Sequence, residues 1–317
     1  MRQLTAAWHN ALKDISKEAW DSLADQYETP LLDWDWLEQF EASGSVRPET
    51  GWLPNHLTVW DGDRLIGAAP LYLKGHSEGE FVWDYVWADV AGQLGTKYYP
   101  KLVGMSPATP AVGYRFLTHP DEDDEALTAV MLKQIGELAE EYGVSGVQFN
   151  FVDPRWQAAV DRLGYIAWEH QSYLWENEAF DSFDDYLSVF TKNQRKNIRK
   201  ERRSMEEQGL TLRALTGSDI PDSHFELMWR YYEKTNDQFG PWAAKYLNRE
   251  FFLGLAPRFR HRLLFIAAYD GGDPDPVALS FLLWKDDQLI GRYWGAAQYY
   301  DRSEERRVGK ECPSPCR

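Results

Sequence analysis

The sequence predicts a mixed α/β protein built from two similar units. Helix-like and strand-like segments alternate along the chain, and one strand–turn–strand pattern occurs twice. Residues 56–71 form a strand pattern, an aromatic-Asp-Gly turn and a second strand that starts with small residues, and residues 265–282 repeat this form. Each copy follows two expected helices, which favours a duplicated domain over an array of short repeats.

In the first half, the segment Asp121–Tyr142 is the best-supported helix. It opens with acidic residues and then repeats apolar side chains at helical spacing. The dipeptide Asp61-Gly62 suits a hairpin turn between two strands. The expected helices are residues 19–27, 35–42, 121–142 and 156–163, and the expected strands are residues 56–60, 65–73, 81–87, 147–151, 165–168 and 172–175.

The second half begins after a strongly basic stretch. Apolar residues at i, i+3, i+4 and i+7 over Phe183–Phe190 predict an amphipathic helix that continues directly into this stretch. Beyond Gly209 the expected elements are strands at residues 210–215, 263–269, 277–284 and 288–294 and helices at residues 222–235 and 245–255.

These patterns predict an N-terminal domain over residues 1–180, a helical connector over 181–209 and a C-terminal domain over 210–301. Residues 302–317 have neither period and resemble translated vector sequence, so we expect a non-native tail that leaves the second domain incomplete.

The basic stretch, residues 191–203, holds seven of the 34 Lys and Arg residues in a chain of net charge −16. The like charges of such a segment repel one another, which lowers stability unless an anion binds there. Three interpretations stay open: a solvated helix, a clamp for an anionic ligand, or a dock onto the acidic residues 121–125. As a clamp it would hold a diphosphate, coenzyme A or tRNA phosphates close to the pocket of the N-terminal unit. The candidate anion-binding residues are Lys192, Arg195, Lys196, Arg199 and Arg202.

Composition narrows the class of protein. The only cysteines, Cys312 and Cys316, lie near the end of the sequence, so we expect neither a disulfide framework nor a cysteine nucleophile. No signal peptide or membrane-spanning run is present, which predicts a cytoplasmic protein. The histidines lack metal-ligand spacing, so no metal is expected. The acidic body argues against DNA binding.

Several short motifs resemble those of a bacterial family within the GNAT acyltransferase superfamily. They are Tyr72–Ala88 with its His-Ser-Glu-Gly-Glu block, Tyr98–Leu102, Pro107–Gly113, Lys196–Arg202 and Gly291–Gly295. This family is described as peptidoglycan biosynthesis or recognition proteins and is similar to the Fem aminoacyltransferases. The resemblance covers residues 20–297 and implies two tandem GNAT-like domains. In residues 171–175 the family usually has a histidine where this chain has Leu174.

The candidate catalytic residues are His76, Glu80 and Asp84. Glu80 or His76 would accept a proton from an attacking amine. If residues 81–87 form a strand, Glu80 and Asp84 share one face and raise each other's pKa. Two plainer interpretations remain open: residues 74–79 form an exposed polar turn, and Asp84 only satisfies a buried tyrosine.

The candidate donor site is the loop Thr109–Gly113 with Arg115. GNAT-type folds hold the pyrophosphate of coenzyme A on backbone N–H groups at the start of a helix, and this loop precedes the helix expected over residues 121–142. The residues proposed to bind the donor are Thr109, Gly113 and Arg115. A proline-stiffened connection without a ligand is the alternative.

The sequence therefore predicts acyl or aminoacyl transfer to an amine of a cell-wall precursor or another small, anionic acceptor. The donor would be acetyl-CoA, another acyl-CoA or an aminoacyl-tRNA, with no metal. A non-catalytic protein that recognises an anionic muropeptide or nucleotide is the main rival. RNA binding through the basic stretch alone is a third possibility.

Overall fold

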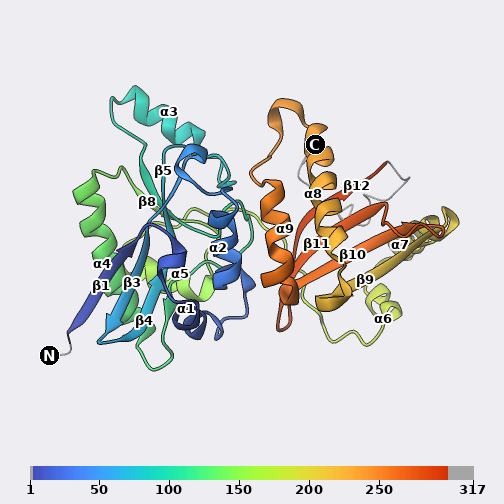
Figure 1. Ribbon diagram of the computed structural model, residues 1–317, viewed down its shortest axis with the longest axis horizontal. Coiled ribbons are helices and arrows are strands. Elements are labelled where there is room, and N and C mark those ends of the chain that lie inside the picture. The colour runs from blue at the N-terminus through green and yellow to red at the C-terminus, as the bar shows by residue number, and fades with distance from the viewer. Residues whose placement is uncertain (1–2, 299–317) are drawn as a thin grey trace.

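The computed structural model describes residues 3–298, so the predicted tail over 302–317 lies outside the described residues. The described chain forms two mixed α/β units that lie side by side along the long axis of the molecule (Figure 1). Helices α2 and α9 lie between the two sets of strands.

The first unit contains two four-stranded sheets. One sheet is antiparallel, in the order β1-β3-β4-β7, and the other has the order β2-β5-β6-β8, with β6 and β8 parallel. Only Pro70 separates β4 from β5, so one stretch of chain passes from the first sheet into the second. The strands are β1 Leu4–His9, β2 Trp52–Pro54, β3 His56–Asp61, β4 Arg64–Ala69, β5 Leu71–Lys74, β6 Lys101–Gly104, β7 Leu117–Thr118 and β8 Val147–Phe149.

The helices of the first unit are α1 Lys17–Ala24, α2 Trp34–Ala42, α3 Tyr85–Gln93, α4 Asp124–Tyr142 and α5 Pro154–Arg162. Helix α4 confirms the best-supported helix of the sequence. The Asp123 side chain caps it by accepting a bond from the Ala126 N–H, and Gly143 ends it with a φ of 62°. These are the usual chemical signals for a helix start and end.

The second unit has a single antiparallel sheet in the order β12-β11-β10-β9. The hairpins β3–β4 and β10–β11 each follow two helices, which confirms the duplicated pattern. The elements are α6 Phe183–Ser188, α7 Lys192–Glu207, β9 Leu210–Thr216, α8 Asp222–Asp237, α9 Arg249–Arg258, β10 Leu263–Asp270, β11 Ala278–Lys285 and β12 Gln288–Ala296.

Aromatic side chains on α2 and α9 join the two units. The ring of Trp36 lies 5.6 Å from that of Phe251, and Phe40 lies 4.6 Å from the same ring, measured between centroids. All three residues are buried in one hydrophobic core that extends through both units. Burial of aromatic surface on this scale makes the boundary resemble a domain core.

Buried charges also cross this boundary. Asp33 accepts a bond from Lys285 Nζ at 2.9 Å and another from Arg262 Nε at 3.0 Å. Lys285 is almost fully buried and also donates to the Ala24 carbonyl at 3.1 Å. The second unit therefore inserts a lysine into the first, where a carboxylate compensates its charge.

Three sequence-based expectations about elements were wrong. Residues 81–87 form no strand: Phe81 and Trp83 have positive φ values of 58° and 44°, and α3 follows. Residues 165–175 have no regular secondary structure. The amphipathic and basic segments are separate helices, because Thr191 starts α7 with a capping box to Gln194.

Candidate active site between the two units

The loop after β5 carries the predicted catalytic residues. Its turn at Phe81 and Trp83 directs Glu80 and Asp84 inward, so both carboxylates become fully buried. Both carboxylates reach Lys101, but through a loop with positive φ at two residues and not through the expected strand alternation, and neither lines the cavity described below.

Lys101 on β6 lies between these carboxylates. Its Nζ is 2.7 Å from Glu80 Oε2 and 2.5 Å from Asp84 Oδ2, and the lysine is 1% exposed. It also donates to Ser77 Oγ at 2.7 Å and to Gln148 Oε1 at 3.0 Å. The resulting buried ion cluster fixes the loop against the second sheet.

The carboxylates of this ion cluster differ in pKa. Burial raises the pKa of Glu80, and the nearby Lys101 only partly offsets this effect. Burial also acts to raise the pKa of Asp84, but hydrogen bonds from Lys101, Ser77 and Tyr98 outweigh it and lower the pKa. The Tyr98 hydroxyl donates to Asp84 Oδ2 at 2.8 Å. Glu80 Oε1 and Asp84 Oδ1 are buried without a hydrogen-bond partner in the described chain.

A second buried lysine lies beside the ion cluster. Lys74 Nζ lies 3.5 Å from the centre of the Trp52 ring and donates to the Glu78 carbonyl at 3.0 Å. Burial lowers the pKa of Lys74 to about 7, which the nearby Glu80 counteracts only in part. This lysine is therefore poised to lose its charge near neutral pH.

His76 lies closer to solvent, over Gly51. Its Nδ1 accepts a hydrogen bond from the Glu78 N–H at 3.2 Å, so in the neutral ring the proton is on Nε2. A Cβ atom on Gly51 would lie 1.9 Å from that Nε2, so only glycine leaves room for the ring. Burial and the charge of Lys74 lower the pKa of His76, which favours the neutral ring.

A cavity of about 330 Å³ lies between the two units next to this loop. Both units line it. The lining residues are Phe40, Ser45, Val46, Glu49, Thr50, Trp52, His76, Glu78, Pro107, Ala108, Ala243, Lys245 and Tyr246. The cavity thus brings two of the resembling motifs, the His76 loop and the Pro107 loop, against the second unit. Glu80 and Asp84 are buried and do not line the cavity.

A third motif reaches the same place from β12. Arg292 is the extra residue of a β-bulge opposite Phe281 and Leu282. Its Nη2 donates to the Ala108 carbonyl at 2.6 Å and to the Tyr293 hydroxyl at 2.9 Å. The bulge therefore directs a cation of the second unit onto the cavity loop of the first.

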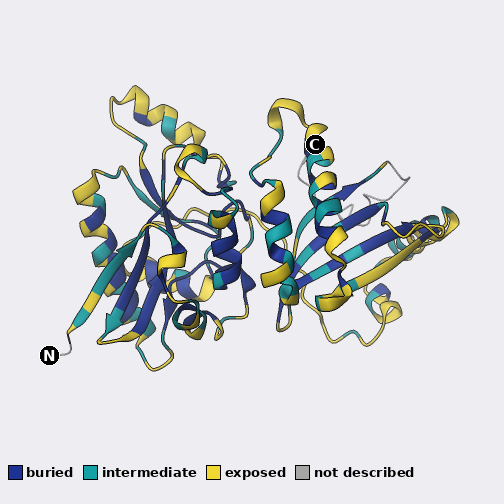
Figure 2. Cartoon of the chain, in the orientation of Figure 1, coloured by how far each residue is buried: buried dark blue, intermediate teal, exposed yellow. Residues whose placement is uncertain are grey.

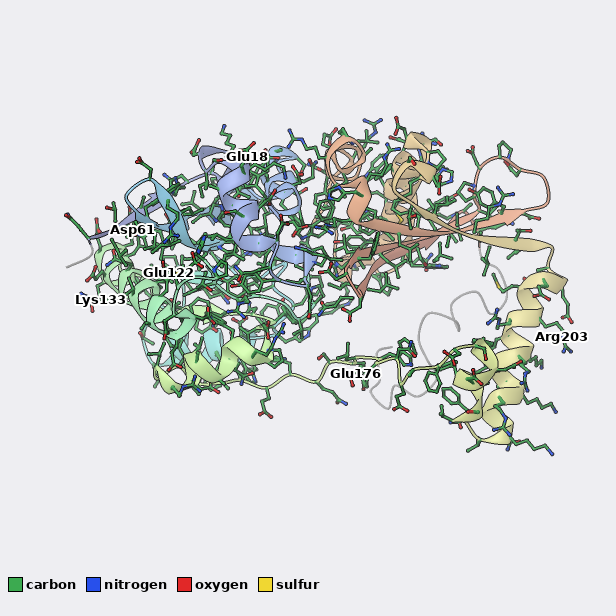
Figure 3. The ribbon with its side chains drawn as sticks, turned by 90° about the horizontal axis from the view of Figure 1, so that it is seen from below. Glu18, Asp61, Glu122, Lys133, Glu176 and Arg203 are labelled. Atoms are coloured by element: carbon green, nitrogen blue, oxygen red, sulfur yellow. The ribbon has the colours of Figure 1, made fainter. Side chains whose placement is uncertain are left out.

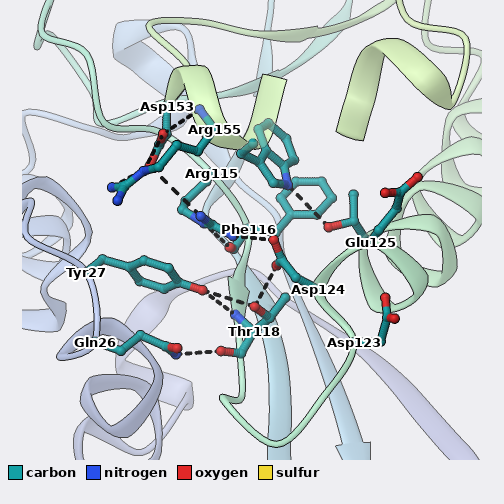
Figure 4. Close-up of polar contacts among 12 residues, drawn as sticks. Gln26, Tyr27, Arg115, Phe116, Thr118, Asp123, Asp124, Glu125, Asp153 and Arg155 are labelled. Carbon is teal, nitrogen blue, oxygen red and sulfur yellow. Dashed lines mark hydrogen bonds and ion pairs between the residues drawn. The ribbon is translucent and has the colours of Figure 1, made fainter. Parts of the chain in front are cut away.

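The predicted donor loop forms no open anion site. Arg115 Nη2 lies 2.6 Å from Asp124 Oδ2, and its guanidinium lies 4.4 Å from the centre of the Tyr27 ring (Figure 4). Thr109 is buried and donates to the Pro107 carbonyl, and a Cβ on Gly113 would lie 2.7 Å from Thr29 Oγ1.

The start of α4 also differs from a phosphate site. The side chain of Asp123 occupies the Ala126 N–H, and Asp124 and Glu125 fill the first turn. Since these carboxylates already complement the helix dipole, a pyrophosphate would meet repulsion there. The residues of this loop therefore do not fit coenzyme A in the described structure.

The arginines of the basic helix are partly occupied. Arg195 Nη1 donates to the Phe190 carbonyl at 2.6 Å, Arg199 pairs with Asp184 at 3.0 Å, and Arg202 lies over the Phe183 ring at 3.9 Å. The contacts of Arg199 and Arg202 bind α7 to α6, and the contact of Arg195 holds the segment between the two helices.

The lysines on α7 are more open to a ligand. Within the described residues Lys192, Lys196 and Lys200 are exposed and have no ion-pair partner. Helix α7 lies at the opposite end of the molecule from α4 (Figures 1 and 3, where Arg203 and Glu122 mark the two ends). Of the three interpretations left open, the dock onto residues 121–125 does not agree with this arrangement. The expected position close to the pocket of the N-terminal unit is also wrong.

Neither metal nor membrane-spanning features occur within residues 3–298. The described histidines and acids form no group of three or more that could hold a metal ion. In the same part of the chain, every helix is too short or too polar to cross a bilayer.

Two mixed α/β units with a motif-lined cavity between them define a tandem GNAT-like protein. The chain belongs to the FemAB-like family, described as peptidoglycan biosynthesis/recognition, whose model matches residues 11–302. The crystal structure of FemX is similar with a TM-score of 0.50 at 10% identity, over 89% of this chain and 79% of that chain.

A tandem GNAT protein from the clavulanic acid biosynthesis pathway, solved without AcCoA, has a TM-score of 0.41 at 12% identity, over 93% of this chain and 79% of that one. A search of curated proteins finds no match. The likeness to FemX supports the fold, and the family supports a transferase-type function linked to peptidoglycan.

Sequence reasoning missed the centre of the ion cluster. Lys101 sits in the motif Tyr98–Leu102, but a lone lysine at the start of a strand gave no reason to place it between two acids. Glu78 and Tyr246 were also missed as cavity residues. Glu78 could have been noticed, because it stands between His76 and Glu80 in the same polar motif.

Proposed function

We propose that this protein transfers an acyl or aminoacyl group to the amine of a peptidoglycan-related acceptor, which binds in the cavity between the two units. One observation carries the proposal: the cavity collects the His76 and Pro107 motifs of one unit and the Lys245–Tyr246 segment of the other. Sites between domains are common places for ligands of this size.

The lining suits an acceptor with an amine and an extended body. Glu49 and Glu78 offer carboxylates that attract an ammonium group, and the rings of Trp52 and Tyr246 offer apolar faces. Binding there would hold the amine in place before it meets the acyl carbonyl, which is how a positioning enzyme lowers its barrier.

His76 has a defined proton state in this proposal. With Nδ1 engaged by the Glu78 N–H, the neutral ring offers Nε2–H as a donor. It takes up a proton from the amine only after the Glu78 contact breaks. The role of Glu80 as proton acceptor and the catalytic role of Asp84 stay predictions; in the described structure both bind Lys101.

The acyl donor is proposed as coenzyme A-linked or tRNA-linked. No step places coenzyme A at the start of α4, since the acidic residues there do not fit a pyrophosphate. The donor class is therefore a question for the assay.

The test uses the full chain with acetyl-CoA or an aminoacyl-tRNA and a panel of amines that includes a lysine-containing muropeptide precursor. Thiol release or loss of charged tRNA reports transfer. We expect Ala243→Trp, which fills the cavity, to abolish turnover, and Ala158→Trp, on the exposed face of α5, to leave it unchanged. Equal activity of both variants would refute the assignment.

Recognition without chemistry is the second candidate. The burial of Glu80 and Asp84 favours it, because of the three predicted catalytic residues only His76 lines the cavity. Fold does not decide between the two functions. Tight binding of the precursor that Ala243→Trp removes, with no turnover on any donor, would establish the binding protein.

A further inference from the structure

Helix α3 directs its large apolar side chains toward solvent and its small ones toward the protein. At about 100° per residue, Val86, Val90 and Leu94 form one stripe with Trp87 at its side. Only the small residues Ala88 and Ala91 turn toward the protein. This is the reverse of an ordinary surface helix, whose large apolar residues face the core.

The exposed fractions are high. Trp83 is 68% exposed, Val86 69% and Leu94 76%. Trp168, from a segment distant in sequence, adds to the same surface, since its ring lies 6.1 Å from that of Trp87. We call Trp83, Tyr85, Val86, Trp87, Val90, Leu94 and Trp168 the α3 patch.

The α3 patch projects away from the sheets of the first unit. Figure 1 shows α3 at the outer edge of this unit, and Figure 2 shows it exposed along most of its length. A flat partner could therefore approach the helix along its exposed side.

We propose that the α3 patch binds the surface of a phospholipid bilayer, with α3 lying in the plane of the interface. Tryptophan and tyrosine prefer the boundary between headgroups and acyl chains, and valine and leucine enter the acyl region. Asp89 is the only charged residue of the helix, and it is exposed next to Val86 at the margin of the α3 patch.

A second copy of the chain is the alternative occupant. A stable dimer needs a partner surface that is complementary in shape to the α3 patch, over roughly 800 Å² on each side. A bilayer adapts to projecting side chains and needs no such complementary surface.

The charge of the protein sets the lipid preference. With a net charge of −16 and a nearly uncharged patch, the protein gains nothing from anionic lipid through α3. Binding should therefore occur on zwitterionic vesicles and persist at high salt. This surface is independent of the proposed transfer, because vesicle binding requires no donor or acceptor.

The test is flotation of the full chain with phosphatidylcholine vesicles, with and without anionic lipid, at low and high salt. We expect the protein to float with zwitterionic vesicles. Val86→Asp with Leu94→Asp should weaken partitioning at least tenfold. The matched control is Val130→Asp with Leu289→Asp, which adds the same charges at exposed apolar positions elsewhere. Circular dichroism confirms that each variant is folded.

Several results would overturn the proposal. They are no flotation of the wild type, equal loss in both double variants, or binding that requires anionic lipid and disappears at high salt, which would implicate α7. Light scattering addresses the second copy: a dimer that Val86→Asp with Leu94→Asp dissociates, without vesicle binding, would also contradict it.

Discussion

Lys101 Nζ on β6 lies 2.7 Å from Glu80 Oε2 in the loop after β5, and both side chains are buried. Lys101 is thus the only described cation that bonds both buried carboxylates of this loop. Replacing Lys101 therefore measures how much the ion cluster contributes to the stability of the fold.

Lys101→Met should lower the free energy of unfolding by about 3–5 kcal/mol, because two buried carboxylates lose their cation. Urea unfolding measures the change. Adding Glu80→Gln and Asp84→Asn to this variant should recover part of the loss, since the remaining groups are neutral. No loss in the single variant would show that the cluster is solvated.

The two carboxylates should affect acid stability in opposite directions. The folded-state pKa of Asp84 is depressed, so its contribution is present above the unfolded pKa and is lost as pH falls through the folded pKa. The pKa of Glu80 is raised, so between its unfolded and folded pKa values stability falls as pH rises.

Asp84→Asn should therefore flatten the acid loss of stability, and Glu80→Gln should steepen it. Urea midpoints between about pH 3 and pH 7 test both. Identical pH profiles for the two variants would contradict the assigned directions.

Lys74 should make stability rise with pH above neutrality. Burial lowers its folded-state pKa to about 7, whereas an unfolded lysine titrates near 10.4. Between these values the unfolded chain binds more protons, so the folded state gains stability as pH rises. Lys74→Met should remove this gain in urea midpoints measured at about pH 6, 8 and 9.5. If Lys74→Met still gained stability as pH rises, another titrating group would be responsible for the gain.

Asp33 should be essential to the boundary between the units. Asp33→Asn leaves the buried Lys285 with only the exposed Asp25 carboxylate, 3.9 Å away, and we expect a loss of about 3–5 kcal/mol in the free energy of unfolding. Glu125→Gln breaks an exposed pair with Arg162 and should leave the urea midpoint nearly unchanged. Comparable effects in both variants would mean that the Asp33 pair is not buried in solution.

The lysines of α7 should carry its anion affinity. Lys192→Glu with Lys196→Glu should weaken binding of a model RNA and reduce the slope of log affinity against log salt by roughly two. Arg199 already pairs with Asp184, so Arg195→Glu with Arg199→Glu should weaken binding less. A larger loss of RNA affinity in the arginine double variant would show that the arginines are the main anion-binding residues.

Much of the fold follows from sequence periodicity. The helix at 124–142 and the two hairpins were predictable because spacing, capping residues and Asp-Gly turns agree there. The predicted domain boundaries at 180, 209 and 301 stay predictions. Helix α3 was missed because its alternating aromatic residues imitate a strand, and only the left-handed turns at Phe81 and Trp83 end that pattern.

The candidate site was harder to predict than the fold. His76, Glu80 and Asp84 were identified as a polar group, but only His76 lines the cavity, because Glu80 and Asp84 bond the buried Lys101 from another motif. Arg115 was predicted to bind a phosphate because the sequence does not show that its guanidinium pairs with Asp124. The sequence showed only that the start of this helix is acidic. Pairing across sequence distance decided both cases.

The aromatic contact between α2 and α9, reinforced by Lys285, also determines how the molecule can move. Since neither half can swing outward without uncovering Trp36 and Phe251, opening like a clamshell would be costly. A ligand of the cavity between the units must therefore enter a gap of nearly fixed width, so the protein would select this ligand by shape.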